Sequence, residues 1–307
     1  MKKLITTLAA LSLIVVMFSG CATKAPLVTP TAVPSTVPTA NPLTVTDFLD
    51  RTVTLNATPK KIVSLTASNT ELVYALGLQD MLVGVDAYSN YPDAAAKLDK
   101  VGDFNGPNVE KIISLEPDLI LAGNKLQNDA VQQLSDKGLN VIAAEATTYE
   151  EIYKSIDMIS SICGVTEKGA ALEAQMRATE QQIKDLAKGK PAVSVYYVLS
   201  FGEYGDYTIG SNNFITDLLT LAGANVVTKN EPVAWPQYSI EKIIADNPDF
   251  LIYDTGSKLE DLQKATGYKD LSAIKNNKVI GVDADKMNRP ANRCLDEALE
   301  IAKKLYS

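Results

Sequence analysis

Aromatic side chains in predicted loops are the residues of this chain best suited to recognise a ligand. Each one follows a predicted strand or precedes a predicted helix, and in open α/β sheets ligands bind at that edge. Flat rings with polar tips suit a large, partly apolar ligand between two lobes, whereas the alternative for any single ring is packing against its own domain. The eight rings belong to Tyr88, Tyr91, Phe104, Phe201, Tyr204, Tyr207, Trp235 and Tyr238.

Residue patterns for catalysis and metal binding are absent from the sequence. The chain has no His, which removes the usual general base, the Ser-His-Asp triad and most zinc or haem-iron sites. It also has no Cys-x-x-Cys, Gly-x-Ser-x-Gly or P-loop motif. We therefore predict a binding protein that is not an enzyme and has no metal or cofactor of its own.

Composition and charge bound the size of the fold and its partners. The 307 residues are 46% hydrophobic, enough for two domains, and the formal net charge is −8. A nucleic-acid-binding surface would be basic and clustered, so no nucleic-acid partner is expected. Cys163 and Cys294 could pair in an oxidising compartment, but their apolar, helical settings favour free buried thiols.

The N-terminus has the layout of a secretory signal peptide. Lys2 and Lys3 precede an apolar run that is too short to span a membrane comfortably, and small residues follow it. Cys21, which comes directly after Phe-Ser-Gly, resembles the lipidated Cys of a bacterial lipobox. We predict a signal peptide over residues 1–20, lipidation of Cys21, and a location on the extracytoplasmic face of the cell membrane.

A Pro- and Thr-rich segment follows the predicted lipidation site. Pro recurs at positions 26, 30, 34, 38 and 42 among Thr, Ala and Val. Such a composition cannot form a packed core, so residues 21–44 are predicted to be an extended tether between the lipid and the folded part.

A short sequence occurs once in each half of the folded part. Asn108–Leu121 and Ser239–Ile252 each read as a short helix, a Pro-Asp stop and an apolar strand, because Pro cannot continue a helix. The separation is too long for a solenoid and indicates two similar lobes, with the repeated Ile pairs in their cores. Six positions are identical: Glu110/Glu241, Lys111/Lys242, Ile112/Ile243, Ile113/Ile244, Pro117/Pro248 and Asp118/Asp249.

The order of predicted elements favours an α/β fold. Strands alternate with helices in both halves, which is typical of mostly parallel sheets flanked by helices. We predict an N-terminal lobe over 45–147, a linker over 148–190 and a C-terminal lobe over 191–307. Strands are predicted at 61–66, 81–85, 119–122, 140–144, 193–199 and 278–282, and helices at 128–137, 166–188, 212–222 and 290–305.

Two helices carry more specific expectations. The helix that ends at Gly77 is predicted to be capped by Ser68 or Asn69, with Glu71 in its first turn. The helix over 166–188 follows a break at Gly164 and would span about 30 Å. We predict that it is a rigid spine between the lobes rather than a hinge.

Four segments together carry a family resemblance. They are Ile62–Leu72, Tyr88–Pro92, Val101–Glu110 and Trp235–Glu241. As a set they resemble the substrate-binding proteins of ABC importers for cobalamin and iron-siderophores, most of all the cobalamin-binding members. The resemblance covers roughly residues 45–305. It implies two α/β lobes joined by one long rigid helix, with the ligand in a cleft between the lobes.

The resemblance also implies roles for particular residues. Four aromatic positions match cleft residues that contact the corrinoid, and two polar positions match contacts from the last loop. Arg293 competes with Arg289 for one polar position, and the corrinoid would be cargo rather than a cofactor. The implied ligand-binding residues are Tyr88, Phe104, Phe201, Trp235, Asp285 and Arg289.

A second implied site concerns the transporter. In this family one surface Glu on each lobe docks into Arg pockets of the permease, and Glu110 and Glu241 match those positions. The alternative, a first-turn Glu that stabilises its own helix, is compatible with docking.

The resulting hypothesis is a monomeric, lipid-anchored receptor that captures a corrinoid such as cobalamin or cobinamide. It would deliver this ligand to a permease dimer with its ATPase. An iron-siderophore or haem receptor of the same family is the alternative, although only Arg289 and Arg293 supply evident positive charge for a siderophore. A chelatase-like enzyme, or a sensory or adhesive surface domain, is a more remote alternative.

Overall fold

The computed structural model describes residues 42–103, 106–123 and 127–306. Cys21 and Phe104 lie outside the described residues, so their predicted roles stay predictions. The described chain begins with an antiparallel hairpin of β1 (Leu43–Thr46) and β2 (Thr52–Leu55). β1 therefore starts just before residue 45, the predicted beginning of the first lobe.

The first lobe contains a parallel sheet of four strands in the order β4-β3-β7-β8. Every residue of β3, β7 and β8 is buried. Burial on both faces is typical of a parallel sheet covered by helices, as predicted. The strands are β3 (Ile62–Ser64), β4 (Leu82–Val85), β7 (Leu119–Ala122) and β8 (Val141–Ala143), and the helices are α1 (Ala67–Ala75), α2 (Val109–Ser114) and α3 (Asn128–Asp136). A two-stranded ribbon, β5 (Gly102–Asp103) with β6 (Gly106–Pro107), lies between β4 and α2.

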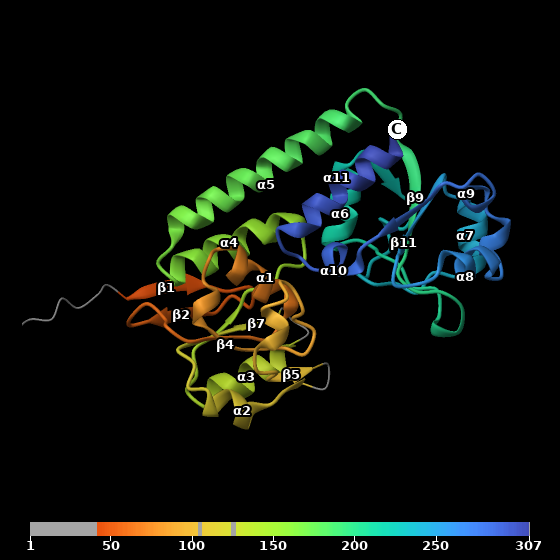
Figure 1. Ribbon diagram of the computed structural model, residues 1–307. Coiled ribbons are helices and arrows are strands. Elements are labelled where there is room, and N and C mark those ends of the chain that lie inside the picture. The colour runs from red at the N-terminus through yellow and green to blue at the C-terminus, as the bar shows by residue number, and fades with distance from the viewer. Residues whose placement is uncertain (1–41, 104–105, 124–126, 307) are drawn as a thin grey trace, which may run out of the picture. The chain divides into compact units, whose positions relative to one another are not determined.

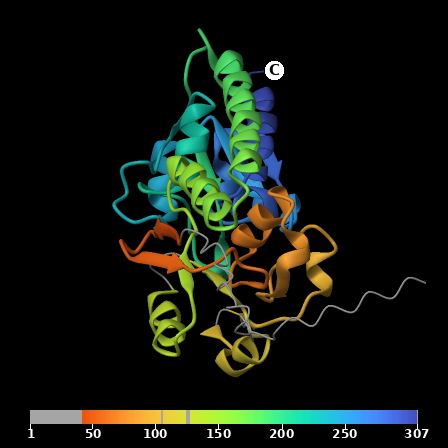
Figure 2. The ribbon, with the colours of Figure 1, turned by 90° about the vertical axis from the view of Figure 1, so that its left-hand side faces the viewer.

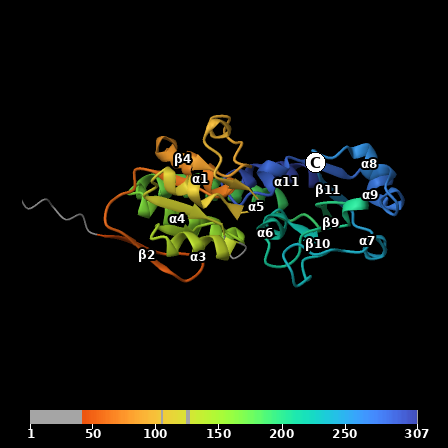
Figure 3. The same ribbon diagram turned by 90° about the horizontal axis from the view of Figure 1, so that it is seen from below.

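The second lobe repeats this topology. Its parallel sheet has the order β10-β9-β11-β12. If the four strands of each sheet are numbered along the chain, both sheets have the order second, first, third, fourth. The strands are β9 (Val193–Val198), β10 (Ala224–Val226), β11 (Phe250–Asp254) and β12 (Val279–Val282). The helices are α6 (Phe214–Leu221), α7 (Ile240–Asp246), α8 (Leu259–Lys264), α9 (Ser272–Lys275), α10 (Ala284–Met287) and α11 (Arg293–Leu305). Figure 3 shows the second-lobe strands grouped apart from α1, α3 and β4 of the first lobe.

The sequence repeat occupies equivalent places in the two lobes. The first copy forms α2 and β7, the second forms α7 and β11, and in each case the strand is the third of its sheet along the chain. The N-cap side chains act alike: Asn108 accepts a hydrogen bond from the backbone N–H of Lys111 (3.0 Å), and Ser239 accepts one from that of Lys242 (3.4 Å). The repeated aspartates also act alike, since each accepts a backbone hydrogen bond at or just before the start of the first strand of its sheet. Asp118 Oδ2 accepts from Lys61 N (3.0 Å), and Asp249 Oδ2 accepts from Ser194 N (2.8 Å).

One prediction about the repeat is wrong for half of its apolar residues. Ile112 and Ile243 are fully buried, but Ile113 and Ile244 are 44% and 46% exposed. Adjacent helical residues point about 100° apart, so a short helix lying on a sheet can bury only one of the two. The duplicated helix therefore presents an apolar side chain on its outer surface in both lobes.

Two helices connect the lobes. α4 (Tyr149–Ile162) begins with a capping box of Thr148 and Glu151, and α5 (Thr166–Ala187) follows a break at Gly164, whose φ is +69°. α5 packs against α4 at one end and α11 at the other, and Figures 1 and 2 show it alongside α11. Cys163 and Cys294 are buried free thiols, which confirms the favoured alternative.

The predicted start of α1 is wrong in one respect that affects the site. The N-cap is Thr66, whose side chain accepts from Asn69 N, rather than Ser68 or Asn69. Glu71 therefore lies beyond the first turn, and it is buried with 3% of its surface exposed. A buried carboxylate needs partners within the protein rather than a helix dipole.

Candidate ligand-binding site

The loop that follows β4 is fixed at its base by buried polar groups. Asp86 is buried, and its carboxylate accepts hydrogen bonds from Tyr88 N (2.9 Å) and from the Ser89 hydroxyl. Lys100 donates from Nζ to Ser89 O (2.9 Å), and burial lowers the pKa of its ammonium group. This support leaves the side chains of Tyr88 and Tyr91 44% and 45% exposed at the carboxyl edge of the first sheet.

A short helix of the second lobe, α10, carries Asp285, and Arg289 follows directly after its C-cap residue Asn288. Asp283 caps α10 by accepting from Asp285 N (2.9 Å) and Lys286 N (3.3 Å). Arg289 then lies one turn after Asp285, and its Nη2 donates to Asp285 Oδ1 at 2.6 Å. The cap therefore positions this arginine–aspartate pair, whose two members were both predicted from the sequence.

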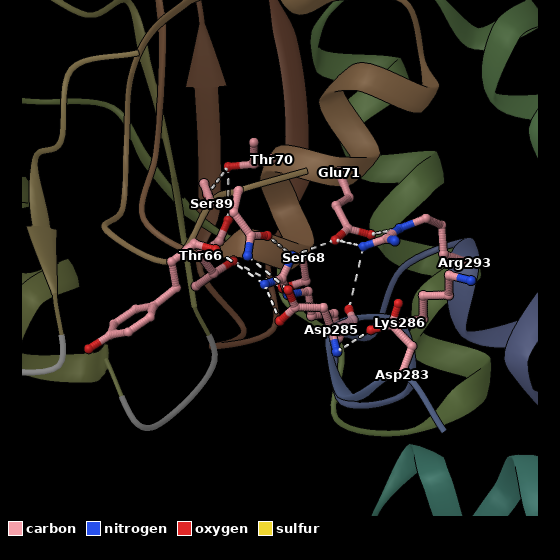
Figure 4. Close-up of polar contacts among 12 residues, drawn as sticks. Thr66, Ser68, Thr70, Glu71, Ser89, Asp283, Asp285, Lys286 and Arg293 are labelled. Atoms are coloured by element: carbon pink, nitrogen blue, oxygen red, sulfur yellow. Dashed lines mark hydrogen bonds and ion pairs between the residues drawn. The ribbon is translucent and has the colours of Figure 1, made fainter. Parts of the chain in front are cut away.

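Glu71 joins α1 of the first lobe to both candidate arginines of the second. Its Oε1 accepts from Arg289 Nη1 (2.9 Å) and Arg293 Nη2 (2.6 Å), and its Oε2 accepts from Arg293 Nε (2.8 Å). Figure 4 shows Glu71 and Arg293 facing each other, with Asp285 beside them. The bidentate geometry is the strong form of an arginine–carboxylate pair.

The charge on Arg293 is stabilised by its surroundings. Burial acts against the charged form, but the hydrogen bonds and the negative charge of Glu71 outweigh it, so the pKa of Arg293 is raised. The guanidinium also lies 3.5 Å from the centre of the Tyr91 ring, a cation–π contact. Arg293 is thus a buried structural partner of Glu71 and Tyr91, and the Arg289 side chain is buried to a similar degree beside the half-exposed Asp285.

Asn90 completes the polar network from the first lobe. Arg289 Nη1 donates to Asn90 Oδ1 (2.9 Å), Arg289 Nη2 donates to Tyr88 O (3.2 Å), and Asn90 Nδ2 donates to Asp285 Oδ2 (2.8 Å). Residues separated by about two hundred positions in the sequence are therefore in direct contact. The structure brings the backbone of Tyr88 together with the side chains of Asp285 and Arg289, and their roles in ligand binding stay predictions.

Phe201 lies in a different environment within the second lobe. It is half-buried, and its ring centre is 5.9 Å from that of Tyr268. Together with Tyr204, Ile240 and Tyr268 it lines a cavity of about 600 Å³. Tyr88, Asn90, Asp285 and Arg289 are not among the residues that line this cavity, so the described contacts of Phe201 are with its own lobe.

Trp235 is held on an irregular segment that pairs with the loop after β9. Backbone hydrogen bonds run from Thr208 N to Pro236 O and from Gly210 N to Ala234 O, both at 3.0 Å. The indole is 38% exposed and is available for contact. Tyr238, in contrast, is a core residue: burial and the hydrogen bond to Asp246 raise its pKa to about 12.

The two predicted docking glutamates are exposed in the first turns of α2 and α7. The pKa of Glu241 is lowered by hydrogen bonds from its own backbone N–H and from the Ser239 hydroxyl, so this carboxylate stays ionised. The neighbouring lysines form ion pairs, Lys111 with Asp99 (3.1 Å) and Lys242 with Glu231 (3.6 Å).

Cavity size alone does not locate the site. A larger cavity, about 700 Å³, lies by β1 and α4 and is lined by Asp47, Phe48, Glu145 and Met158 among others. It contains none of the residues singled out from the sequence. Within the described part of the chain, no group of three or more Cys, Asp or Glu side chains could hold a metal ion.

Known proteins share both this sequence pattern and this fold. The pattern of the periplasmic binding protein family matches residues 62–286. The chain is 35% identical over 312 residues to an uncharacterized ABC transporter substrate-binding lipoprotein of Bacillus subtilis, covering 100% of this chain and 98% of that protein. It is 32% identical over 256 residues to a vitamin B12-binding protein of Photorhabdus laumondii, covering 82% and 90%.

A solved structure agrees with these relatives. The periplasmic vitamin B12-binding protein of Vibrio cholerae superposes with a TM-score of 0.71 at 28% identity, over 81% of this chain and 97% of that one. The chain therefore belongs to the periplasmic binding protein family, as a substrate-binding protein of an ABC importer. Proteins of this family are components of transport systems, in agreement with the predicted binding protein. Among the described residues, no helix is long and apolar enough to cross a membrane.

Sequence reasoning missed two residues of the network. Glu71 was assigned to the helix terminus because its spacing fits that role, and its arginine partners are more than two hundred residues away in the sequence. Asn90 had no signal beyond its place between Tyr88 and Tyr91. A Glu in an otherwise buried helix, with Ser68, Asn69 and Leu72 around it, was the available hint.

Proposed function

We propose that this protein captures a corrinoid outside the cytoplasm and delivers it to an ABC permease. The observation that carries the proposal is a fixed arginine–aspartate pair, Arg289 and Asp285, beside the exposed rings of Tyr88 and Tyr91. A corrinoid combines a broad macrocycle with polar side chains around its rim. The exposed rings would pack against the macrocycle, and the charged pair would bind the rim.

The relatives support the same ligand class. Vitamin B12-binding proteins match this chain over 80% or more of its length at about 30% identity. The absence of His from the whole sequence favours cargo that needs no protein imidazole on its metal.

A ligand panel tests this proposal. The protein is titrated with cyanocobalamin, dicyanocobinamide, haemin and a ferric hydroxamate siderophore, with quenching of the single Trp, Trp235, as the signal and calorimetry as the check. We expect micromolar or tighter binding of the corrinoids and binding of haemin and the siderophore at least tenfold weaker, a difference of about 1.4 kcal/mol. Preferred binding of haemin or the siderophore would contradict the proposal.

We further propose that Glu110 and Glu241 dock the loaded protein onto the two permease subunits. Their equivalent places in two lobes of identical topology suit a partner with two-fold symmetry. Exposed carboxylates can pair with cations of the partner.

The docking proposal predicts a separation of binding from uptake. The double variant Glu110→Ala, Glu241→Ala should bind corrinoid as the wild type does, yet reduce uptake by cells at least about tenfold, since desolvated ion pairs at interfaces are costly to break. The matched control is Glu150→Ala, Glu260→Ala, which removes exposed first-turn glutamates of α4 and α8. Equal uptake by both double variants would refute docking through Glu110 and Glu241.

A further inference from the structure

The Asn90 side chain lies between two charged groups whose chemistry orients it. Arg289 only donates hydrogen bonds and Asp285, as a carboxylate, only accepts them. The amide oxygen of Asn90 therefore faces Arg289 Nη1 at 2.9 Å, and its nitrogen faces Asp285 Oδ2 at 2.8 Å. One primary carboxamide thus satisfies one donor and one acceptor of the other lobe at the same time.

The two charged groups keep their places without help from Asn90. Arg289 is held by Glu71 (2.9 Å), by Asp285 (2.6 Å) and by the backbone oxygen of Tyr88 (3.2 Å). The backbone N–H of Asp285 is held by the cap residue Asp283 (2.9 Å). A donor and an acceptor fixed side by side form a preorganised receptor for any group that carries both functions.

Few ligand groups complement this pair. A carboxylate would accept from Arg289 but be repelled by Asp285, and an ammonium group would meet the reverse. A primary carboxamide satisfies both, as Asn90 itself demonstrates. Solvent reaches the pair at Asp285, whose side chain is 49% exposed, whereas the Arg289 side chain is 11% exposed while the exposed Asn90 contacts it.

We infer that Asn90 is a specificity-determining residue: its carboxamide occupies the Asp285–Arg289 pair and is exchanged for a carboxamide of the ligand. The inference rests on the proposed function, because corrinoids carry primary carboxamides around the macrocycle, whereas haem carries carboxylates. Exchange of like for like leaves both charged groups satisfied in the free protein and in the complex. It also lowers the affinity by the strength of the internal contacts that the ligand must replace.

Removal of the internal carboxamide tests the exchange. Asn90→Ala should bind dicyanocobinamide about three- to tenfold more tightly by calorimetry, since the ligand no longer displaces two hydrogen bonds to charged groups. The matched control is Asn225→Ala, which removes an exposed amide that contacts Lys229 in the second lobe and should leave the affinity unchanged. Thermal unfolding of both variants should stay close to that of the wild type.

A second measurement separates recognition from a purely structural effect. A corrinoid whose peripheral amides are hydrolysed to carboxylates should bind the wild type poorly, and Asn90→Ala should not improve it, because Asp285 still repels it. In Asp285→Asn the discrimination between the amide and carboxylate corrinoids should shrink. A change of fold or rigidity would shift both ligands together instead.

The binding of the amide and carboxylate corrinoids to Asn90→Ala and to the wild type decides whether the exchange takes place. If Asn90→Ala binds dicyanocobinamide more tightly than the wild type does, and binds the corrinoid with hydrolysed amides no better, the exchange is supported. Unchanged or weaker dicyanocobinamide binding by Asn90→Ala overturns the inference and leaves the proposed corrinoid function standing. If the wild type binds no corrinoid at all, the proposed function and the inference fail together.

Discussion

At the scale of residues, the site is organised by one buried carboxylate. Glu71 contacts both Arg289 and Arg293, and the side chains of Glu71, Arg289 and Arg293 are only 1%, 11% and 10% exposed. Two cations near one anion leave a net positive charge, which Asp285 balances at the surface. The network therefore fixes the position of Arg289 while keeping its neighbour Asp285 accessible.

This arrangement predicts a large cost for Glu71→Gln. The amide keeps the shape but removes the carboxylate that pairs with the buried Arg293 and leaves Arg289 to pair with Asp285, which should lower the free energy of unfolding by about 3–5 kcal/mol. Urea denaturation measures this value. The exposed Glu150→Gln should change it by no more than about 0.5 kcal/mol, and a Glu71→Gln variant as stable as this control would contradict the role of Glu71.

At the scale of elements, α4 and α5 are locked together by a buried acid. The hydroxyls of Tyr149 and Tyr153 donate to Glu180 Oε2 at 3.0 and 3.1 Å, and Arg177 and Lys184 pair with the same carboxylate. Burial alone would raise the pKa of Glu180, but the hydrogen bonds from Lys184 and the two tyrosines outweigh it and lower the pKa. This contact supports the predicted rigid spine.

The sign of the pKa shift sets a pH-dependent prediction. Because the folded pKa lies below the ordinary 4.5, the stabilising effect of Glu180 is present above pH 4.5 and is lost as the pH falls through the folded value. Glu180→Gln should lower the free energy of unfolding by about 1–3 kcal/mol at pH 7. The free energy of unfolding of this variant should also depend less on pH over the acid range than that of the wild type. Denaturation at neutral and acidic pH, with the exposed Glu167→Gln as control, measures both effects. Parallel pH profiles for wild type and Glu180→Gln would contradict it.

Several elements were predictable because their signals are local. The repeated Glu-Lys-Ile-Ile and Pro-Asp pattern predicted two similar lobes, and the two sheets have the same strand order. The break at Gly164 and the Pro-Asp stops were also local. β10 was missed because three residues, Ala224–Val226, carry no periodicity, and the exposure of Ile113 was missed because only packing shows which face of a short helix is buried.

The site was predictable only in part, because a local sequence pattern does not specify contacts between residues that are distant in the sequence. Tyr88, Asp285 and Arg289 were predicted because they match short sequence motifs of the family, and the structure places them in contact. Glu71 and Asn90 act through partners distant in sequence, and no local pattern specifies such contacts. Phe201 fits the loop rule, yet it packs on Tyr268 in its own lobe.

At the scale of the whole molecule, residues 40–307 form one compact unit. Buried apolar residues form a continuous cluster that includes both lobes and the connecting helices, such as Leu121, Ile156, Ile183, Leu218 and Ile301. The relative from Bacillus subtilis is named a lipoprotein. The predicted lipid on Cys21 would tether this unit to the membrane.

The anchor predicts a change of location for Cys21→Ser. Without the thiol no lipid can be attached, and the loss of buried acyl chains removes about 0.8 kcal/mol of membrane binding per methylene. The variant should appear in the soluble fraction, whereas Cys163→Ala, which alters a buried thiol, should stay with the membranes. Retention of Cys21→Ser in the membrane fraction would contradict lipidation at this residue.

Equilibrium dialysis of the purified protein against cyanocobalamin is the most direct test of the central claim. The account predicts one corrinoid bound per chain, with a dissociation constant in the micromolar range or tighter. It also predicts a loss of about tenfold or more in affinity for Arg289→Ala, which removes a charged donor. A wild-type protein that leaves cyanocobalamin equally distributed on both sides of the membrane would contradict it.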